Sequence, residues 1–313
     1  AALACRMLPI ADGSDLGGSL RNPAAFCNVI GFRPSIGRIP NVPNIMGWQS
    51  RLSVQGPMAR TVDDLALLMS VQAGPDTRDP MSLRDLPELS GELGEILKGK
   101  IVGWSLDLQH LPIDPAIAST FNNAARYFTD IGCQVRETKI DLSDAMEVFR
   151  VLRGNYFAET CKAFFDDNQH RIKQTIIDNV NYGRRLSGDD LSNADVKRTE
   201  IYLRMLKFFE THDFLVVPTT QVEPFDLETE WVTEVDGQKM SDYLEWMSVC
   251  CVITTTGLPS ISMPCGFSAS KLPVGLQIIG RPGADFEVLQ MAKSFECATH
   301  FADEIPPILG TNL

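Results

Sequence analysis

A serine that follows two glycines is the first feature of the sequence that could do chemistry. Leu16, Gly17, Gly18 and Ser19 come directly after Asp15. Paired glycines let the backbone adopt positive φ angles and let another group approach within contact distance. Successive N–H groups in such a turn can converge on one point and hold an anion. The pattern predicts a loop in which the Ser19 hydroxyl attacks an amide carbonyl and nearby N–H groups stabilise the resulting oxyanion.

Charged residues on both sides of the serine are expected to fix this loop. Asp15 lies four residues before Ser19, and Arg21 lies two residues after it. A partly buried arginine has five N–H donors that can bind a carboxylate and loop carbonyls. Loss of either partner would leave the other charge buried and unpaired. We therefore expect Asp15 and Arg21 to form a structural pair that supports the loop.

The sequence around the loop is longer and more specific than a Gly-Gly-Ser turn. Residues 13–40 read GSDLGGSLRNPAAFCNVIGFRPSIGRIP. This string closely resembles the defining segment of the amidase signature family, GSDTGGSIRxPAAxCGVVGxKPTxGRxP. The resemblance continues in three further segments, 51–69, 254–267 and 272–280. Residues from about 140 to 250 match the family only in general pattern.

The resemblance implies a triad of Ser, Ser and Lys, in which the Lys is the base and a bridging Ser activates the nucleophile. Carried over to this sequence, the nucleophile is Ser19, and the oxyanion hole consists of the N–H groups of Leu16, Gly17, Gly18 and Ser19. In the family the bridging Ser and the Lys lie upstream of this loop, so neither is assigned to a residue here. We expect an N-terminal portion, covalent or associated, to supply them and to complete the sheet. Residues 1–313 would then be the C-terminal part of a single amidase signature domain.

The expected fold class is α/β, with a mixed central sheet covered by helices on both faces, as the resemblance implies and the alternation of strands and helices permits. Residues 101–104 are an expected strand, 115–132 a helix with apolar residues at helical spacing, and 133–140 a second strand. This order predicts a crossover unit on a parallel part of the sheet. The other expected elements are helices at 1–5, 23–28, 65–73, 144–166, 194–211 and 286–301, a helix and a strand within 247–267, strands at 213–218 and 274–280, and helix caps at Thr61 and Asp285.

Residues that follow the strand at 213–218 are candidates for a substrate pocket. In the family the end of this strand lies near the site, so Thr219 and Thr220 are carried over as pocket residues. Residues 221–240 are acidic and contain Trp231. We interpret them as an excursion of the kind in which loops often carry substrate selection.

Composition limits the partners that the protein can have. The formal net charge is −12, whereas binding to phosphates needs clustered Lys and Arg, so neither nucleic acid nor an anionic membrane is an expected partner. No run of about 18 apolar residues, the length that spans a bilayer, occurs in the sequence. The eight cysteines lack the density of a disulfide scaffold. We expect reduced thiols in a cytoplasmic protein.

No metal site and no cofactor are expected. The four histidines are scattered, and neither an HExxH nor a CxxC motif occurs. Ser268 and Lys271 match the SxxK pattern of penicillin-binding proteins. They are expected in a loop between two strands, where that pattern is not the start of a helix, so we assign them no catalytic role.

Hydrolysis of an amide carbon–nitrogen bond is the function that the resemblance implies, with a small-molecule amide as substrate. Two alternatives stay open. A glutaminase (A-type) subunit of an amidotransferase carries an RRIxxGT-like string, but here Arg184 and Arg185 are followed by LSGDD, which favours a free-standing amidase. A truncated amidase fold that binds a ligand without turnover is the second alternative. Besides the substrate and the N-terminal portion, a second copy of the chain in a homodimer is a candidate partner.

Overall fold

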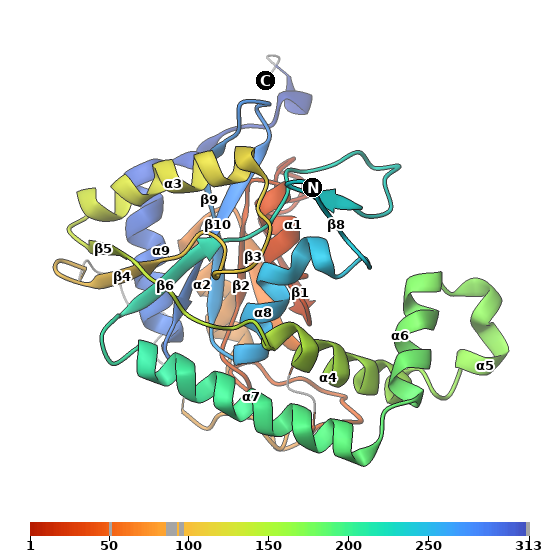
Figure 1. The fold of residues 1–313 in the computed structure, drawn as a ribbon. Coiled ribbons are helices and arrows are strands. Elements are labelled where there is room, and N and C mark those ends of the chain that lie inside the picture. The colour runs from red at the N-terminus through yellow and green to blue at the C-terminus, as the bar shows by residue number, and fades with distance from the viewer. Residues whose placement is uncertain (50–51, 86–92, 94–96, 311–313) are drawn as a thin grey trace.

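A computed structural model describes residues 1–49, 52–85, 93 and 97–310. Within these residues an eight-stranded sheet runs through the centre of the molecule, in the order β1-β3-β2-β9-β10-β6-β4-β5 (Figure 1). Its strands are β1 (Ile10–Asp15), β2 (Ile30–Arg33), β3 (Val54–Ala59), β4 (Ile101–Trp104), β5 (Gln134–Glu137), β6 (Phe214–Pro218), β9 (Ser260–Phe267) and β10 (Pro273–Gly280). A separate hairpin is formed by β7 (Glu234–Val235) and β8 (Gln238–Lys239).

The sheet is mixed, as predicted. Neighbouring strands from β1 to β6 in the sheet order are antiparallel, whereas β4 is parallel to both β6 and β5. The helix between β4 and β5 is α3 (Pro115–Asp130), which begins with Asp114 as its N-cap. The predicted strand, helix, strand crossover is therefore confirmed, and it forms the parallel end of the sheet.

Two glycines of β10 show that helices cover both faces of the sheet. A Cβ atom on Gly275 would meet Ala25 of α1 (Arg21–Phe26), whereas one on Gly280 would meet Val288 of α9 (Asp285–Thr299). Side chains alternate between faces along a strand, so α1 and α9 lie on opposite sides. The other long helices are α2 (Val62–Gln72), α4 (Ala145–Thr160), α6 (Gln174–Arg184), α7 (Gly188–Phe208) and α8 (Ser248–Thr256). α2 and α3 pack with α9, and α4 packs with α7 and α8.

Three sequence predictions concern helix ends, and two of them differ from the structure. Residues 2–6 form turns instead of a helix. The chain leaves the last turn at Arg6, because its φ of 58° is incompatible with a right-handed helix. Asp285 does not cap α9, because its carboxylate accepts the N–H of Ser35 and the Nε of Arg38 instead. The cap predicted at Thr61 is confirmed, since its side chain accepts the N–H of Asp64.

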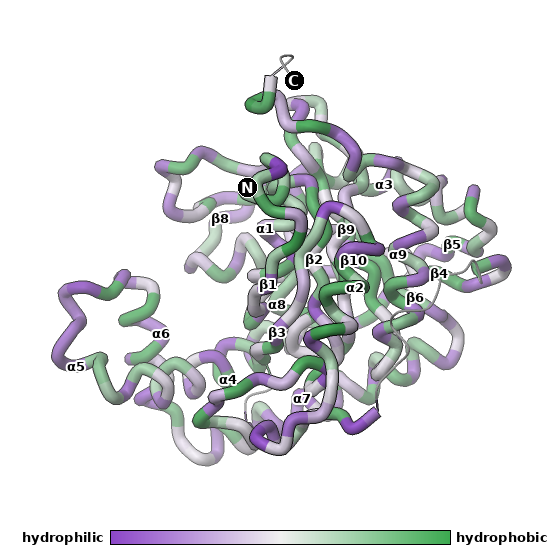
Figure 2. Tube along the Cα trace, turned by 180° about the vertical axis from the view of Figure 1, so that it is seen from behind, coloured by the Kyte–Doolittle hydropathy of each residue, from purple (hydrophilic) through white to green (hydrophobic). Residues whose placement is uncertain are grey.

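The polar stretch between 168 and 193 is more helical than predicted. α6 lies within it, and α7 begins at Gly188 instead of about 194. Ser187 and Asp190 form a reciprocal capping box that starts α7 early. The helix predicted over 144–166 is broken into α4 and a short α5 (Phe165–Asn168). Figure 2 shows stretches of hydrophilic residues in this α5–α6 region, which lies at one side of the molecule.

A close contact between glycines joins α6 to α4. A Cβ atom on Gly183 would lie 2.0 Å from the carbonyl oxygen of Gly154, so the two backbones touch. A small satellite core of Cys161, Phe165 and Val180 supports the same region. The position of α6 is therefore fixed by direct backbone contact as well as by apolar packing.

This contact generates a prediction for stability. Gly183→Ala should lower the free energy of unfolding by about 1–3 kcal/mol, because the added methyl group overlaps a backbone oxygen that cannot move freely. Gly188→Ala is the matched control, since a Cβ atom there has no neighbour within 4 Å. It should leave stability unchanged or raise it by up to about 1 kcal/mol through helix propensity. Chemical denaturation measures both, and equal midpoints for the two variants would contradict the proposed contact.

Candidate active site

Ser19 lies in the turn that connects the edge strand β1 to α1. Gly18 has a φ of 116°, a backbone conformation that a side chain would strain. Ser19 itself is exposed, and within the described part of the chain neither its N–H nor that of Gly17 donates to a protein acceptor. The predicted nucleophile is thus accessible, beside two N–H groups that make no hydrogen bond to the described residues.

Asp15 determines the shape of this turn. Its Oδ1 accepts the N–H of Gly18 at 2.8 Å, and its Oδ2 accepts the N–H of Leu20 at 3.3 Å. One of the four N–H groups predicted for the oxyanion hole, that of Gly18, is therefore already bonded inside the protein. The carboxylate is an anionic acceptor, which makes such bonds stronger than those between neutral groups.

Arg21 holds Asp15 from the opposite side and confirms the predicted pair. The guanidinium Nε lies 2.9 Å from Asp15 Oδ2, and Nη2 lies 3.0 Å from Oδ1. The remaining donors reach the Gln277 side chain, the Thr254 hydroxyl and the carbonyl of Cys250. Asp15 and Arg21 are both fully buried. The pair thus connects the serine turn to β10 and to α8.

Sequence reasoning missed a second buried cation, Arg33, at the end of β2. Its Nη1 donates to the carbonyl oxygen of Asp15 and lies 3.2 Å from Oδ1. Its Nε and Nη2 have no hydrogen-bond partner among the described residues. The signal that could have revealed it is an arginine in the otherwise apolar and fully buried segment Ile30–Arg33.

Burial and charge act against each other in this cluster. Burial raises the pKa of Asp15, but the positive charges of Arg21 and Arg33 outweigh it and lower the pKa to about 2. Burial lowers the pKa of Arg21, but Asp15 outweighs it and raises the pKa above its usual value. Burial dominates at Arg33 and lowers its pKa to about 10. All three groups are charged at neutral pH.

The two glycines of the turn are also required by packing. A Cβ atom on Gly17 would lie 2.9 Å from the ring of Phe149 in α4. On Gly18 it would lie 2.6 Å from the side chains of both Asn22 and Cys250. The glycines therefore let the turn sit directly against α4 and α8, in addition to allowing the positive φ.

The predicted pocket residues lie behind this turn. Thr219 and Thr220 are buried, and the Thr219 hydroxyl lies 3.0 Å from that of Ser262. The Thr219 carbonyl accepts a weak bond from the thiol of Cys250, which also packs against Gly18. A substrate contact for Thr219 and Thr220 stays a prediction.

Other candidate groups are separate from this site. Ser268 and Lys271 lie in the tight turn between β9 and β10, as expected. Within the residues that the structure covers, no group of three or more His, Cys, Asp or Glu side chains could hold a metal ion. None of the helices described is long and apolar enough to cross a membrane.

Comparison with known proteins places this chain in a family. The family model described as Amidase matches residues 1–289 of the chain. The chain therefore belongs to the amidase signature family, and the resemblance found in the sequence is confirmed. The eight-stranded mixed sheet with helices on both faces is the fold shared with solved members of that family.

Individual relatives include amidases and components of amidotransferases. An acylamidase of Rhodococcus erythropolis is 30% identical over 98% of this chain. The A-type subunit of the glutamyl-tRNA(Gln) amidotransferase from Moorella thermoacetica is also 30% identical over 98% of it. The chain spans 65% of the length of the acylamidase and 67% of that of the amidotransferase component.

Solved structures give the same two groups. A bacterial aryl acylamidase of the amidase signature family superposes with a TM-score of 0.89 at 28% identity, over the whole of this chain and 67% of its own. The A-type subunit of the glutamyl-tRNA(Gln) amidotransferase from Thermotoga maritima superposes with a TM-score of 0.77 at 26% identity, over 96% of this chain and 64% of its own.

The buried cluster generates a prediction for the pH dependence of stability. The pKa of Asp15 is about 2 in the folded protein and 3.8 in its ordinary state, so the cluster's contribution is complete above about pH 4 and is lost as pH falls through 2. The difference corresponds to about 2 kcal/mol. Asp15→Asn should abolish this component and, by leaving two buried cations without their anion, destabilise the protein at pH 7 by about 3–5 kcal/mol.

The control for this prediction is an exposed ion pair. Asp166 binds Arg184 at 2.9 Å on the surface, so Asp166→Asn should cost less than about 1 kcal/mol. Urea denaturation of both variants at pH 7 and at pH 3 measures the effects. A loss in Asp15→Asn no larger than that in Asp166→Asn would show that the cluster does not stabilise the fold.

Proposed function

We propose that this chain is the part of an amidase that carries the nucleophile. The observation that supports this function is the exposed Ser19 on a glycine turn whose shape is fixed by a buried carboxylate. Ser19 Oγ would add to the carbonyl carbon of an amide, the carbon–nitrogen bond would then break, and the amine would leave with a proton. Water would release the acyl group from Ser19 and regenerate the hydroxyl.

The oxyanion hole in this proposal uses the N–H groups of Leu16, Gly17 and Ser19. Gly18 N–H, bonded to Asp15, is assigned to holding the turn in place. Donors fixed in advance stabilise developing charge without reorganisation, and losing one costs about 10²- to 10³-fold in rate in other acyl-transfer enzymes. The Lys base and the bridging Ser are proposed to come from an N-terminal portion of the protein, because the family resemblance implies that both lie upstream of the serine loop.

An amidase is favoured over a glutaminase component of an amidotransferase by two observations. The aryl acylamidase superposes more closely than the amidotransferase component, with TM-scores of 0.89 and 0.77. Arg184 is one of the two arginines in the string that departs from the amidotransferase pattern. It binds Asp166 on the surface. The proposed substrate is therefore a small-molecule amide.

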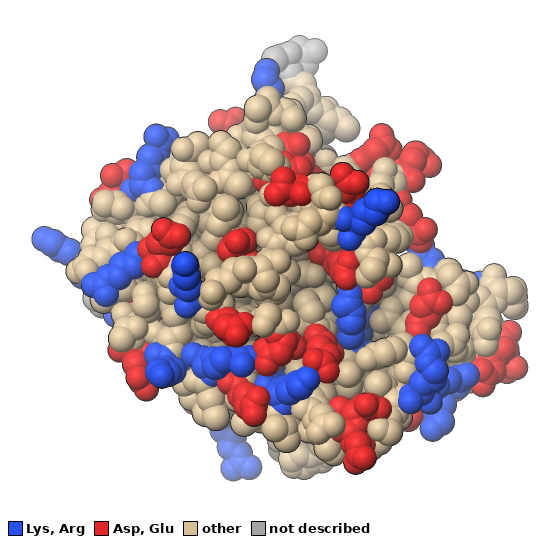
Figure 3. All heavy atoms as spheres, viewed as in Figure 1, with Lys and Arg blue, Asp and Glu red and all other residues tan. Residues whose placement is uncertain are grey.

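The distribution of surface charge and the state of the cysteines support proposals for the partners and the cellular compartment of the protein. On the face shown in Figure 3, Lys and Arg are interspersed with Asp and Glu, and no basic stripe for a nucleic acid is visible there. All eight cysteines are free thiols. This state supports a reducing compartment such as the cytoplasm. A homodimer remains a candidate assembly that size measurement in solution would test.

The proposed function generates a prediction for Ser19. In the intact protein, Ser19→Ala should abolish hydrolysis of anilide substrates and labelling by a serine-directed fluorophosphonate, because the attacking oxygen is gone. Release of the amine and mass spectrometry of the labelled protein measure the two effects.

Ser14 provides the matched control, since it is an exposed serine on the neighbouring strand β1. Ser14→Ala should retain both turnover and labelling. Undiminished turnover in Ser19→Ala would exclude Ser19 as the nucleophile. Ligand binding without turnover in either protein would instead support the alternative of a non-catalytic amidase fold.

A further inference from the structure

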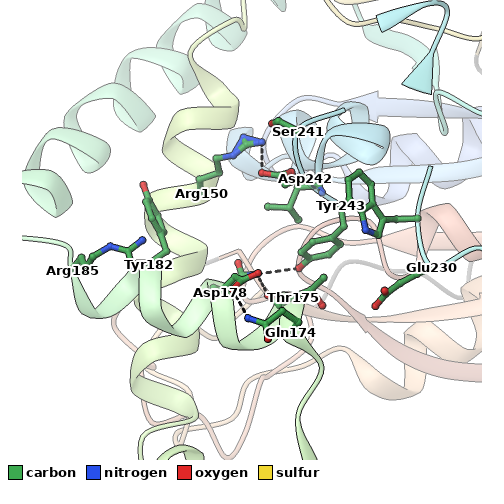
Figure 4. A pocket seen from close by; sticks show the side chains of 13 residues that line it. Arg150, Gln174, Thr175, Asp178, Tyr182, Arg185, Glu230, Ser241, Asp242 and Tyr243 are labelled. Carbon is green, nitrogen blue, oxygen red and sulfur yellow. Dashed lines mark hydrogen bonds and ion pairs between the residues drawn. The ribbon is translucent and has the colours of Figure 1, made fainter. Parts of the chain in front are cut away.

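A cavity of about 560 Å³ lies between α4, α6 and the segment 230–244 (Figure 4). Three aromatic side chains, Tyr182, Trp231 and Tyr243, contribute to its walls, together with polar groups of α6. A volume of this size is typical of sites for small organic molecules. The cavity is thus large enough for an aromatic ring and its substituent.

The hydroxyl of Tyr243 has one hydrogen-bonding position left for a ligand. A phenol oxygen can accept two hydrogen bonds and donate one. The Tyr243 oxygen accepts one bond from Arg153 Nη2 and a longer one, at 3.4 Å, from Asn179 Nδ2. Figure 4 shows Tyr243 directed toward α6 from the far wall of the cavity. Its proton is therefore available to an acceptor inside the cavity.

Burial raises the pKa of Tyr243 above its usual value, and Arg153 acts against this by donating to the hydroxyl oxygen. Arg153 is 8% exposed, and its guanidinium pairs with no carboxylate among the described residues. Its contacts are neutral groups: Asn179 Oδ1 at 3.1 Å, the Tyr243 hydroxyl, and the face of Phe157 at 4.4 Å. A cation that donates to a hydroxyl oxygen polarises that hydroxyl, and its own proton becomes a better donor.

Charged groups of both signs line the cavity. Arg150 binds Asp242 at 2.8 Å and Glu245 at 3.3 Å, and Asp178 accepts a bond from Gln174. With Arg185 and Glu230 also at the walls, cations and anions occur together. A strongly charged ligand would therefore meet like charge as well as opposite charge, which favours a neutral ligand.

α4 contacts both the cavity and the serine turn, since Arg150 lines the cavity and Phe149 lies against Gly17. Phe149 of α4 packs against Gly17, and Arg153 follows one turn later, about 6 Å along the helix axis. On the other side Cys251 of α8 lies 3.6 Å from the Gly17 carbonyl oxygen, and Tyr243 lies in the segment that leads into α8. The elements that line the cavity therefore adjoin those that support the serine turn.

We propose that this cavity binds the part of an amide substrate remote from the bond that is cleaved. The chemical class is a neutral aromatic group with a hydrogen-bond acceptor such as a carbonyl, and Tyr243 donates to that acceptor. The inference rests on the proposed function of Ser19 and deepens it, since it assigns the substrate class to an aryl amide. Tyr243 would be a specificity-determining residue, in contact with the substrate but not with the reacting atoms.

The test measures binding in the absence of turnover. Two aryl amides are used that differ only in a remote para substituent, acetyl in one and isopropyl in the other. Calorimetric titration of the intact Ser19→Ala protein gives the Kd of each. In the Ser19→Ala, Tyr243→Phe double variant, the ratio of the two Kd values should shift about 3- to 10-fold against the acetyl compound, the effect of one net hydrogen bond. Tyr202→Phe, an exposed tyrosine of α7, should leave the ratio unchanged in the same background.

Each outcome supports or contradicts the proposed role of the cavity in substrate binding. A ratio that Tyr243→Phe leaves unchanged, or failure of both compounds to bind, would overturn the proposal. Folding of the double variant is checked by its unfolding midpoint and by its unchanged Kd for the isopropyl compound. Full turnover in the Ser19→Ala protein would show that the proposed function of Ser19 is wrong. The binding measurement does not depend on that result, so the two failures can be distinguished.

Discussion

The structure depends on one buried ion cluster, in which a single carboxylate, Asp15, lies between Arg21 and Arg33 with no solvent exposure of any member. Charges removed from water are costly unless each finds close partners, and this cluster finds them in β1, α1, β2, β10 and α8. Its stability therefore requires all five elements to be in place at once. The same carboxylate holds the N–H groups of Gly18 and Leu20, which links the geometry of the serine turn to the assembly of the sheet.

Packing reinforces that link. β1 is the edge strand of the sheet, so the turn at its end is held by pairing with β3 alone on the sheet side. Gly17 and Gly18 compensate by letting the turn lie against Phe149 and Cys250 without a side chain between. The Ser19 side chain is thus exposed while the backbone that carries it is fixed from behind. An exposed group on a rigid support is what catalysis by fixed N–H dipoles requires.

The sequence was sufficient for the α/β class because the family resemblance implied it. It was also sufficient for the crossover at the parallel end of the sheet and for the pair of Asp15 and Arg21, because these depend on local pattern or on neighbours in the chain. It was insufficient where partners are distant in sequence. Arg33 meets Asp15 across 18 residues, and Arg153 meets Tyr243 across 90, so no local pattern reveals either. Asp285 has the pattern of a helix cap, yet a bond to Ser35 across 250 residues takes its carboxylate.

The contact between Gly154 and Gly183 has a further meaning for ligand selection. Two helices whose main chains touch cannot be brought closer, and separating them would open a gap in a close-packed region. The spacing between α4 and α6 at this contact is therefore fixed and does not adapt to different ligands. The walls that α4 and α6 contribute to the cavity are then fixed relative to each other. Change of specificity during evolution would then be easier through the loop at 230–244 than through the helices.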